Sequence, residues 1–427
     1  MNSLLRKLKK FLPERHPVRL AWHHVKAFFA ALRYGFPARK LFVIGITGTD
    51  GKTTTVEMTA HILKKAGKNV GSVSTASFQV GERQNFNPTQ KTSVSPFVLQ
   101  KFLRDLVQRG CTHAVVEVSS HGLVQGRVDF LFPKVAAITN VTPEHLDYHG
   151  SLEQYRADKG QLFVMLGGKG AKVLNAADPT FARYSGISSR ETVSYGKEGG
   201  DLWISDIEAD AFGSRARLHT DLGGEAALTL SIPGAFNLEN ALCSIACAQA
   251  AGIPLEVSIK ALQTFRGAPG RMERIDEGQN FSVFVDFTVT PVAYEKTLQA
   301  LRKMIGKENR ILVLCGSCGD RMREKRPEVG RVVSAYADIV VVSNEDPYTE
   351  DPHRIIEEVW AGIDQAKVEA HKIFDRLEGI RFLLKKAKAG DAVIFCAKGA
   401  DTTMWTAEGQ IPWNEREIVR EELRKLR

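Results

Sequence analysis

The sequence predicts an α/β protein whose chain forms two mostly parallel sheets, each covered by helices. Three observations predict this class. Short β-branched runs alternate with helical patterns from residue 41 onward, a glycine-spaced loop follows the first of these runs, and a second complete set follows residue 280. We therefore expect a basic leader over 1–40, a larger α/β domain over 41–275 and a second α/β domain over 276–427.

The larger domain combines two kinds of strand pattern. Between 201 and 232 the sequence changes to period-two alternation with glycine-rich turns, which predicts an antiparallel patch attached to a parallel sheet. Helical periodicity resumes at 236–266. Before that patch, the periodicities predict strands at 41–46, 113–118 and 135–141 and helices at 53–66, 95–109 and 151–166.

A glycine- and proline-rich break at 267–270 separates the two domains, and we place the boundary near 272–280. The alternation beyond it is typical of a Rossmann-like sheet. The expected strands are 281–287, 311–315, 338–343 and 391–396, and the expected helices are 291–305, 327–336, 352–362 and 376–388.

The loop after the first strand has the composition of a phosphate-binding loop. Glycines let its backbone approach phosphate oxygens, Lys52 can reach the β- and γ-phosphates, and the Thr53 hydroxyl can bind Mg²⁺. Strict Walker spacing would place a glycine at Ile46, so the loop is a variant of that motif. We expect a P-loop ATPase-like domain that holds a nucleotide through Gly48, Thr49, Asp50, Gly51, Lys52, Thr53 and Thr54.

The net charge of +9 comes from the leader. Residues 1–40 contain ten lysines and arginines against Glu14 alone, and the rest of the chain is balanced. The basic pI therefore gives no reason to expect a nucleic-acid surface. Two leader segments have helical apolar spacing, and each can dock on the adjacent domain or lie on an anionic membrane surface: Leu4, Leu5, Leu8, Phe11 and Leu12, and Trp22, Val25, Phe28, Phe29 and Leu32.

Other global features narrow the class of protein. The sequence shows no apolar run of spanning length and no signal peptide, so we expect a cytoplasmic protein, with peripheral contact at the inner membrane face as one alternative for the leader. Six cysteines in a chain of this length do not indicate a disulfide framework. The lone Cys315-x-x-Cys318 pair is weak evidence for a zinc or redox site.

Polar residues follow two of the predicted strands where a ligand crevice would form. Glu117 ends the strand 113–118, and beside a phosphate loop its carboxylate is a candidate Mg²⁺ ligand. His145 follows the strand 135–141, but a single histidine is more often structural. Lys159, on the helix 151–166, would be a solvated lysine on composition alone.

Five separated motifs occur in one order along the chain, at 47–54, at 117–128, at 139–140 with 145–150, at Lys159 and at 236–240. Together they resemble the central domain of the Mur ligases, specifically the MurE type, which adds the third amino acid to the UDP-N-acetylmuramoyl dipeptide of peptidoglycan. The resemblance implies an ATP-dependent ligase that forms an amide through an acylphosphate.

The resemblance also implies roles for individual residues. Lys159 matches a carbamylated lysine that binds metal, and Glu117 and His145, with Thr53, match the other protein ligands of two Mg²⁺ ions. Nucleotide contacts are implied for Asn140, Asn237, Arg271 and Asp286. The muramoyl-peptide acceptor would be bound by Thr92, Ser93, Ser119, Gln125 and Arg127, and the incoming amino acid by Arg321, Asp346, Tyr348 and Asp401.

The second domain departs from the family pattern. Val289 replaces a nucleotide-side histidine, Tyr348 replaces the arginine that selects diaminopimelate, and 397–401 differs from Gly-Lys-Gly-His-Glu. Only about 40 residues precede the loop, too few for a UDP-binding domain, so the acceptor headgroup stays open. We expect a monomeric ligase; a degenerate Mur-ligase-like scaffold and a P-loop phosphotransferase or NTPase are the alternatives.

Overall fold

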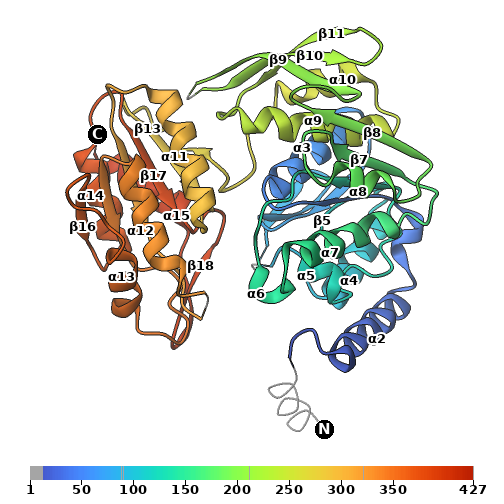
Figure 1. Ribbon diagram of the computed structural model, residues 1–427, viewed down its shortest axis with the longest axis horizontal. Helices are drawn as coiled ribbons and strands as arrows, with labels where there is room; N and C mark the ends of the chain where they lie inside the picture. The colour runs from blue at the N-terminus through green and yellow to red at the C-terminus, as the bar shows by residue number, and fades with distance from the viewer. Residues whose placement is uncertain (1–12, 88, 90, 211, 321, 427) are drawn as a thin grey trace. The chain divides into compact units, whose positions relative to one another are not determined.

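The structure is a computed structural model that describes residues 13–426 except residues 88, 90, 211 and 321. Two compact units, each with its own sheet, make up this part of the chain (Figure 1). The first unit contains the described residues up to Ile207 together with Arg215–Leu230 and Phe236–Phe265, and the second contains those of Glu208–Ser214, Ser231–Ala235 and Arg266–Arg427.

The first unit is built on an 11-stranded sheet with the strand order β11-β10-β9-β8-β7-β6-β1-β5-β2-β3-β4. The pairs from β2 through β5, β1, β6, β7 and β8 to β9 are parallel, whereas β3 pairs antiparallel with β2 and β4. The strands are β1 (Phe42–Thr47), β2 (Val70–Val73), β3 (Ser77–Val80), β4 (Arg83–Phe86), β5 (His113–Glu117), β6 (Val135–Ile138), β7 (Ala171–Asn175), β8 (Glu191–Gly196), β9 (Leu202–Ala209), β10 (Ser214–Thr220) and β11 (Glu225–Leu230).

Several helices of this unit begin at a side chain that accepts a hydrogen bond from one of their first N–H groups. Ser95 and Ser151 cap two of them, with Oγ accepting from Val98 N and Gln154 N. The helices are α2 (Pro17–Tyr34), the 3₁₀ turn η1 (Pro37–Lys40), α3 (Lys52–Lys65), α4 (Pro96–Gln108), α5 (Ser120–Val124), α6 (Leu146–His149), α7 (Leu152–Val164), α8 (Phe181–Ser185), α9 (Phe236–Ala250) and α10 (Leu255–Leu262).

Strand β1 lies between β5 and β6, and this order positions the phosphate loop. Ile46 pairs with Glu117 of β5, and Thr47 pairs with Ile138 of β6. The carboxyl ends of three parallel strands therefore meet at one edge of the sheet, where α/β proteins bind ligands.

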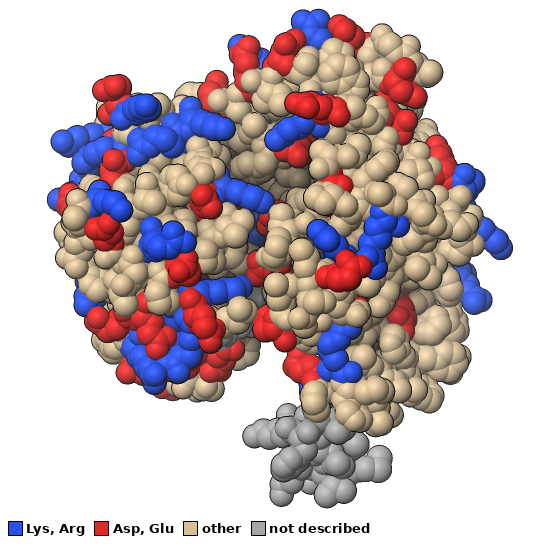
Figure 2. Space-filling view, viewed as in Figure 1, with Lys and Arg blue, Asp and Glu red and all other residues tan. Residues whose placement is uncertain are grey.

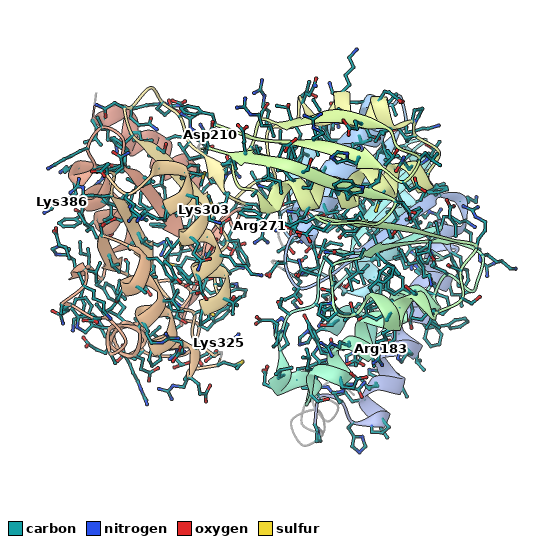
Figure 3. The ribbon with its side chains drawn as sticks, turned by 45° about the horizontal axis from the view of Figure 1, so that its top comes forward. Arg183, Asp210, Arg271, Lys303, Lys325 and Lys386 are labelled. Carbon is teal, nitrogen blue, oxygen red and sulfur yellow. The ribbon has the colours of Figure 1, made fainter. Side chains whose placement is uncertain are left out.

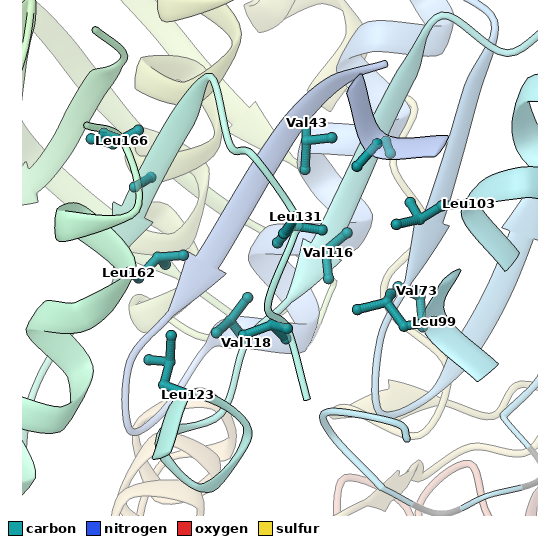
Figure 4. Packing of buried hydrophobic residues seen from close by; sticks show 14 of the residues in the cluster. Val43, Val73, Leu99, Leu103, Val116, Val118, Leu123, Leu131, Leu162 and Leu166 are labelled. Carbon is teal, nitrogen blue, oxygen red and sulfur yellow. The ribbon is translucent and has the colours of Figure 1, made fainter. Parts of the chain in front are cut away.

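A buried apolar cluster holds this edge in place. Val43 of β1, Val116 of β5 and Leu162 of α7 are at most 1% exposed and belong to one cluster (Figure 4). Because α7 packs against the central strands through Leu162, the buried residues Asp158 and Lys159, one turn earlier on the same side of the helix, are also held in fixed positions.

The second unit contains a 6-stranded sheet with the order β12-β13-β17-β14-β15-β16 and a two-stranded hairpin, β18-β19. Only β12 pairs antiparallel within the larger sheet. Its elements are β12 (Glu273–Arg274), β13 (Ser282–Asp286), α11 (Pro291–Ile305), β14 (Ile311–Cys315), α12 (Lys325–Tyr336), β15 (Ile339–Val342), α13 (Pro352–Trp360), β16 (Glu369–Lys372), α14 (Arg376–Lys386), β17 (Ala392–Cys396), β18 (Thr403–Thr406), β19 (Gly409–Pro412) and α15 (Glu415–Lys425).

The predicted α/β class is confirmed. Each strand and helix predicted after residue 40 is present with ends that differ by a few residues, except that the helical region expected at 236–266 is divided into α9 and α10. The patch expected between 201 and 232 is part of the first sheet, as β9, β10 and β11. The sequence patterns did not predict β2, β3 and β4 at one end of this sheet, the inner strands β7 and β8, or, in the second unit, β12, β16, β18 and β19. Most of these are short, and their burial depends on pairing rather than on a local pattern.

Helix α2 docks on the first unit with a different face from the one expected. It packs against α4, and its buried residues are Ala27, Ala30 and Ala31. Of the larger apolar residues, Phe28 contacts Phe130 of the same unit with 6.0 Å between ring centroids. Helix α2 therefore docks, but through small alanines and Phe28 rather than through its whole apolar stripe. Six apolar residues on α2 remain between 42% and 64% exposed: Val18, Trp22, Val25, Phe28, Phe29 and Leu32. The expected helix over Leu4–Leu12 lies outside the described residues.

Charges of both signs are interleaved on the surface of the second unit (Figure 2). Examples are the pairs of Arg323 and Arg354 with Glu358. This agrees with the balanced charge of the chain after residue 40. No described helix combines the length and hydropathy needed to cross a membrane.

Candidate active site

The loop between β1 and α3 requires glycine at two positions. Gly48 has φ 145° and Gly51 has φ 79°, a region that side chains disfavour. A Cβ at Gly48 would lie 1.8 Å from Thr139 Oγ1, and one at Gly51 would lie 2.2 Å from Asn240 Oδ1. The backbone therefore passes closer to its neighbours than any other residue would permit.

Residues that follow β6 hold this loop. Thr139 Oγ1 donates to Asp50 O at 2.6 Å, and Asn140 Oδ1 accepts from Asp50 N at 3.0 Å. Lys52 Nζ donates to Thr49 O at 2.7 Å, so the ammonium group lies against the backbone of the loop. Helix α3 begins at Lys52 without a side-chain cap, so the positive end of its dipole faces the loop. These residues fit the phosphates of a nucleotide.

Two oxygen-bearing side chains meet beside the loop. Thr53 Oγ1 lies 3.1 and 3.0 Å from the two carboxylate oxygens of Glu117. Thr75 N also donates to Glu117 Oε2 at 2.6 Å, which fixes the carboxylate. Hydroxyl and carboxylate oxygens are the ligands that Mg²⁺ prefers, usually with phosphates and water completing its shell. This pair fits a Mg²⁺ ion held mainly by a bound nucleotide.

His145 lies beside His121. It is exposed, has φ 55°, and its ring packs against His121 with 4.8 Å between centroids. Burial, together with the neighbouring His145 and His149, lowers the pKa of His121 to about 3. Among the described residues no group of three or more His, Cys, Asp or Glu side chains is arranged to hold a metal ion. A metal role for His145 stays a prediction.

Lys159 is not the solvated lysine that composition suggested. It is 1% exposed, its Nζ donates to Gly48 O at 2.6 Å, and it lies 4.4 Å from the centre of the Tyr155 ring. Burial, reinforced by the charge of Lys52, lowers the pKa of Lys159 well below its usual value. Burial therefore disfavours the charged form of this side chain.

Three further residues belong to the site. Tyr155 OH lies 3.2 Å from Thr49 Oγ1, Thr139 holds Asp50, and Asn240 lies against Gly51. Asn240 Nδ2 donates to Asn237 Oδ1 at 3.1 Å, which places the predicted adenine contact next to the loop. Thr139 and Asn240 lie within the motifs at 139–140 and 236–240, but the sequence predicted no role for them or for Tyr155.

The residues predicted to bind the acceptor form one network. Ser93 Oγ accepts from Ser119 N at 2.9 Å, and Ser93 O accepts from Arg127 at 3.0 Å. Arg127 also donates to Gln125, whose Nε2 donates to Tyr148 OH at 3.1 Å. The fifth predicted residue, Thr92, bonds to Thr75, which also contacts Glu117.

In the second unit, the two predicted nucleotide residues lie together. Met272 N donates to Asp286 Oδ1 at 2.6 Å, and burial raises the pKa of Asp286. Arg271, labelled in Figure 3, donates to Phe287 O at 3.4 Å and lies 4.5 Å from the centre of that ring. These contacts hold the segment just before β12 against Asp286 and Phe287.

The residues predicted to select the amino acid surround a buried lysine. Lys398 Nζ lies 2.8 Å from both oxygens of Asp346 and 3.5 Å from Asp401 Oδ2. Asp346 Oδ1 also accepts from Trp405 N at 2.8 Å, so this carboxylate binds its own protein on both oxygens. The Tyr348 ring stacks on Trp405 with 5.6 Å between centroids. Arg321 lies outside the described residues.

Comparisons with known proteins cover most of the chain. Residues 46–248 match the Mur ligase middle domain, and residues 270–399 match the Mur ligase, glutamate ligase domain. The UDP-N-acetylmuramoyl-L-alanyl-D-glutamate--2,6-diaminopimelate ligase of Geobacillus kaustophilus (strain HTA426) is 37% identical over 402 residues, which cover 92% of this chain and 81% of that protein. The UDP-N-acetylmuramyl-tripeptide synthetase of Roseiflexus sp. (strain RS-1) is 36% identical over 416 residues, covering 93% and 81%.

A solved structure supports the same relationship. The structure of a UDP-N-acetylmuramoyl-L-alanyl-D-glutamate--2,6-diaminopimelate ligase matches 96% of this chain and 83% of that chain, with a TM-score of 0.66 and 28% identity. The fold, the two matched domains and the sequence identity to these enzymes all agree. The chain belongs to the Mur ligase family.

Proposed function

We propose that this protein is an ATP-dependent ligase that joins a carboxylate of a muramoyl peptide to the amine of an amino acid through an acylphosphate. One observation carries the proposal: the phosphate loop, the Thr53–Glu117 pair and Lys159 converge at the carboxyl edge of β1. We assign ATP binding to the domain formed by residues 41–275 and amino-acid binding to the domain formed by residues 276–427. Residues 1–40 form the basic leader.

The chemistry needs positive charge because a carboxylate must attack a negatively charged phosphoryl group. Lys52 and the amino end of α3 supply that charge from the protein. Mg²⁺ supplies the rest when bound, by neutralising phosphate oxygens. Thr53 and Glu117 would hold one ion, and Lys159 as a carbamate would provide the carboxylate-like ligand for a second, with His145 as the further ligand predicted.

The acceptor network would orient the attacking carboxylate. Arg127 is the cation of this network, and Ser93 and Gln125 fix its guanidinium. The relatives are named as ligases acting on UDP-N-acetylmuramoyl-L-alanyl-D-glutamate, and we infer a muramoyl-peptide acceptor of the same class. Tyr348 lacks the charge to pair with a second carboxylate, so we infer an amino acid other than diaminopimelate.

We further propose that the leader contacts anionic membrane. Helix α2 contains no acidic residue, and its exposed apolar residues recur every three or four positions, which places them on one stripe. A basic helix with an exposed apolar stripe is the kind that lies in a membrane interface.

Mass spectrometry of mixtures of ATP, muramoyl peptides and single amino acids tests the proposal. We expect ADP, phosphate and a new amide to form only when acceptor and amino acid are both present. ATP hydrolysis that needs neither would identify a simple NTPase, and binding without turnover would identify a scaffold.

A further inference from the structure

The N-terminal segment contributes a side chain to the active-site region. Arg15 donates to both carboxylate oxygens of Asp158, from Nη1 at 2.6 Å and from Nη2 at 3.2 Å. Asp158 directly precedes Lys159 on α7 and is 1% exposed. A two-point pair between guanidinium and carboxylate fixes orientation as well as distance.

The contact continues from Asp158 into the acceptor region. His149 Nδ1 lies 2.6 Å from Asp158 Oδ2, and His149 Nε2 lies 3.0 Å from Ser120 Oγ. Nδ1 also lies 3.2 Å from Arg15 Nη1, but the Asp158 carboxylate is closer. We therefore assign Nδ1 the ring proton, and Nε2 then accepts from the Ser120 hydroxyl. Ser120 begins helix α5 directly after Ser119, one of the predicted acceptor contacts.

These three residues have the order of a Ser-His-Asp triad but not the access that a nucleophile needs. Ser120, His149 and Asp158 are 2%, 3% and 1% exposed. An inaccessible hydroxyl cannot attack a substrate. The arrangement is therefore a brace between helices α5 and α7.

We propose that Arg15 is a positioning residue for the ligation reaction, because its two hydrogen bonds to Asp158 fix the Ser120–His149–Asp158 contacts between the helices. The inference rests on the proposed function. Helix α7 is held on one side by Arg15 and on the other by the bond from Lys159 to Gly48. Small misplacements of catalytic groups cause large losses of rate, so loosening one side should slow the reaction.

The test compares the kinetics of the full-length wild-type protein with those of Arg15→Ala and Arg15→Lys. We expect Arg15→Ala to lower kcat by about ten- to hundredfold with little change in the KM for ATP. Arg15→Lys keeps the charge but loses the fork, so it should retain intermediate activity. Millimolar methylguanidinium should restore part of the activity of Arg15→Ala, because the Arg15 side chain is 29% exposed and its place can be refilled.

Two matched controls separate positioning from general docking of the leader. Arg104→Ala removes an arginine of α4 that bonds to Tyr34 O at 3.4 Å, and His24→Ala removes a 2.6 Å contact to Asp129. Both substitutions weaken contacts between the leader and the rest of the first unit, and neither residue contacts Asp158. We expect both to keep the wild-type kcat.

Several results would overturn the inference. Unchanged kcat in Arg15→Ala, an equal loss in the two controls, or a loss that follows thermal unfolding and ignores methylguanidinium would each do so. If Arg15→Ala does not fold, wild-type kcat in a folded Arg15→Lys decides against it. Absence of turnover in the wild type would reject the proposed function and this inference together, whereas normal turnover in both wild type and Arg15→Ala rejects this inference alone.

Discussion

Lys159 donates a 2.6 Å hydrogen bond to the carbonyl oxygen of Gly48, across 111 positions of sequence. This contact joins helix α7 to the phosphate loop and removes the lysine from solvent. Burying a lysine costs free energy, and a single hydrogen bond to a backbone oxygen offsets only part of that cost. The same position matches the carbamylated lysine implied by the family resemblance, so this residue is the first target for mutation.

Lys159→Ala should abolish ligation without unfolding the protein, because it removes the proposed metal ligand. Bicarbonate with a short carboxylate such as acetate should restore measurable turnover by filling the vacated position. The measurement is the steady-state rate of wild type and of Lys159→Ala, each with and without these additives. Full activity of the variant without additives would show that Lys159 has only a structural role.

Lys52→Ala should eliminate ATP turnover, since Lys52 is the cation of the phosphate loop. Thermal unfolding checks that the fold is intact. Lys68→Ala, which changes an exposed lysine beyond helix α3, is the charge-matched control and should behave as wild type. Wild-type turnover by Lys52→Ala would reject the ligase assignment.

The protein should use lysine, ornithine or a smaller amino acid in preference to meso-diaminopimelate by about a hundredfold or more, because no arginine stands at position 348. Tyr348→Arg should raise the rate with diaminopimelate. Tyr348→Phe keeps the ring that stacks on Trp405 and should leave the preference unchanged. Comparable wild-type rates with lysine and diaminopimelate would mean that another residue supplies the charge.

Glu345 should make stability depend on pH. Burial, with the adjacent charge of Asp346, raises the pKa of Glu345 to about 7, so the folded state holds its proton more tightly than the unfolded chain. The contribution of this proton to the stability of the folded state is complete below the unfolded pKa of 4.5, and it is lost as the pH rises through the folded pKa of about 7. Between pH 5 and 8, the free energy of unfolding of the wild type, measured with denaturant, should fall by about 1–3 kcal/mol more than that of Glu345→Gln. Parallel curves for the two proteins would contradict this.

The leader should bind anionic vesicles, but not neutral ones, at low salt. Each lysine or arginine near such a surface contributes about 1 kcal/mol, and salt screens the attraction. Deleting residues 1–40 should abolish co-sedimentation. Replacing Trp22 and Phe29 with serine keeps every charge but removes apolar surface, so it should weaken binding. Equal recovery of full-length and truncated protein with anionic vesicles would leave the leader as a structural brace.

Local patterns in the sequence were enough to predict the order and type of most elements, the phosphate loop and the family. Glycine spacing, apolar periodicity and short motifs depend on neighbouring residues, so they can be read without knowing the fold. Glu117 was predicted in this way because it ends a strand, and the structure places it beside Thr53.

Pairings between distant residues depended on the tertiary structure. Strand order brings Lys159 to Gly48, and helix docking selects the alanine face of α2 and carries Arg15 to Asp158. Asp346, predicted only as a substrate contact, binds Lys398 for the same reason. Each of these contacts joins segments that are far apart in the chain, and their side chains meet only after two packed elements have fixed the distance and direction between them.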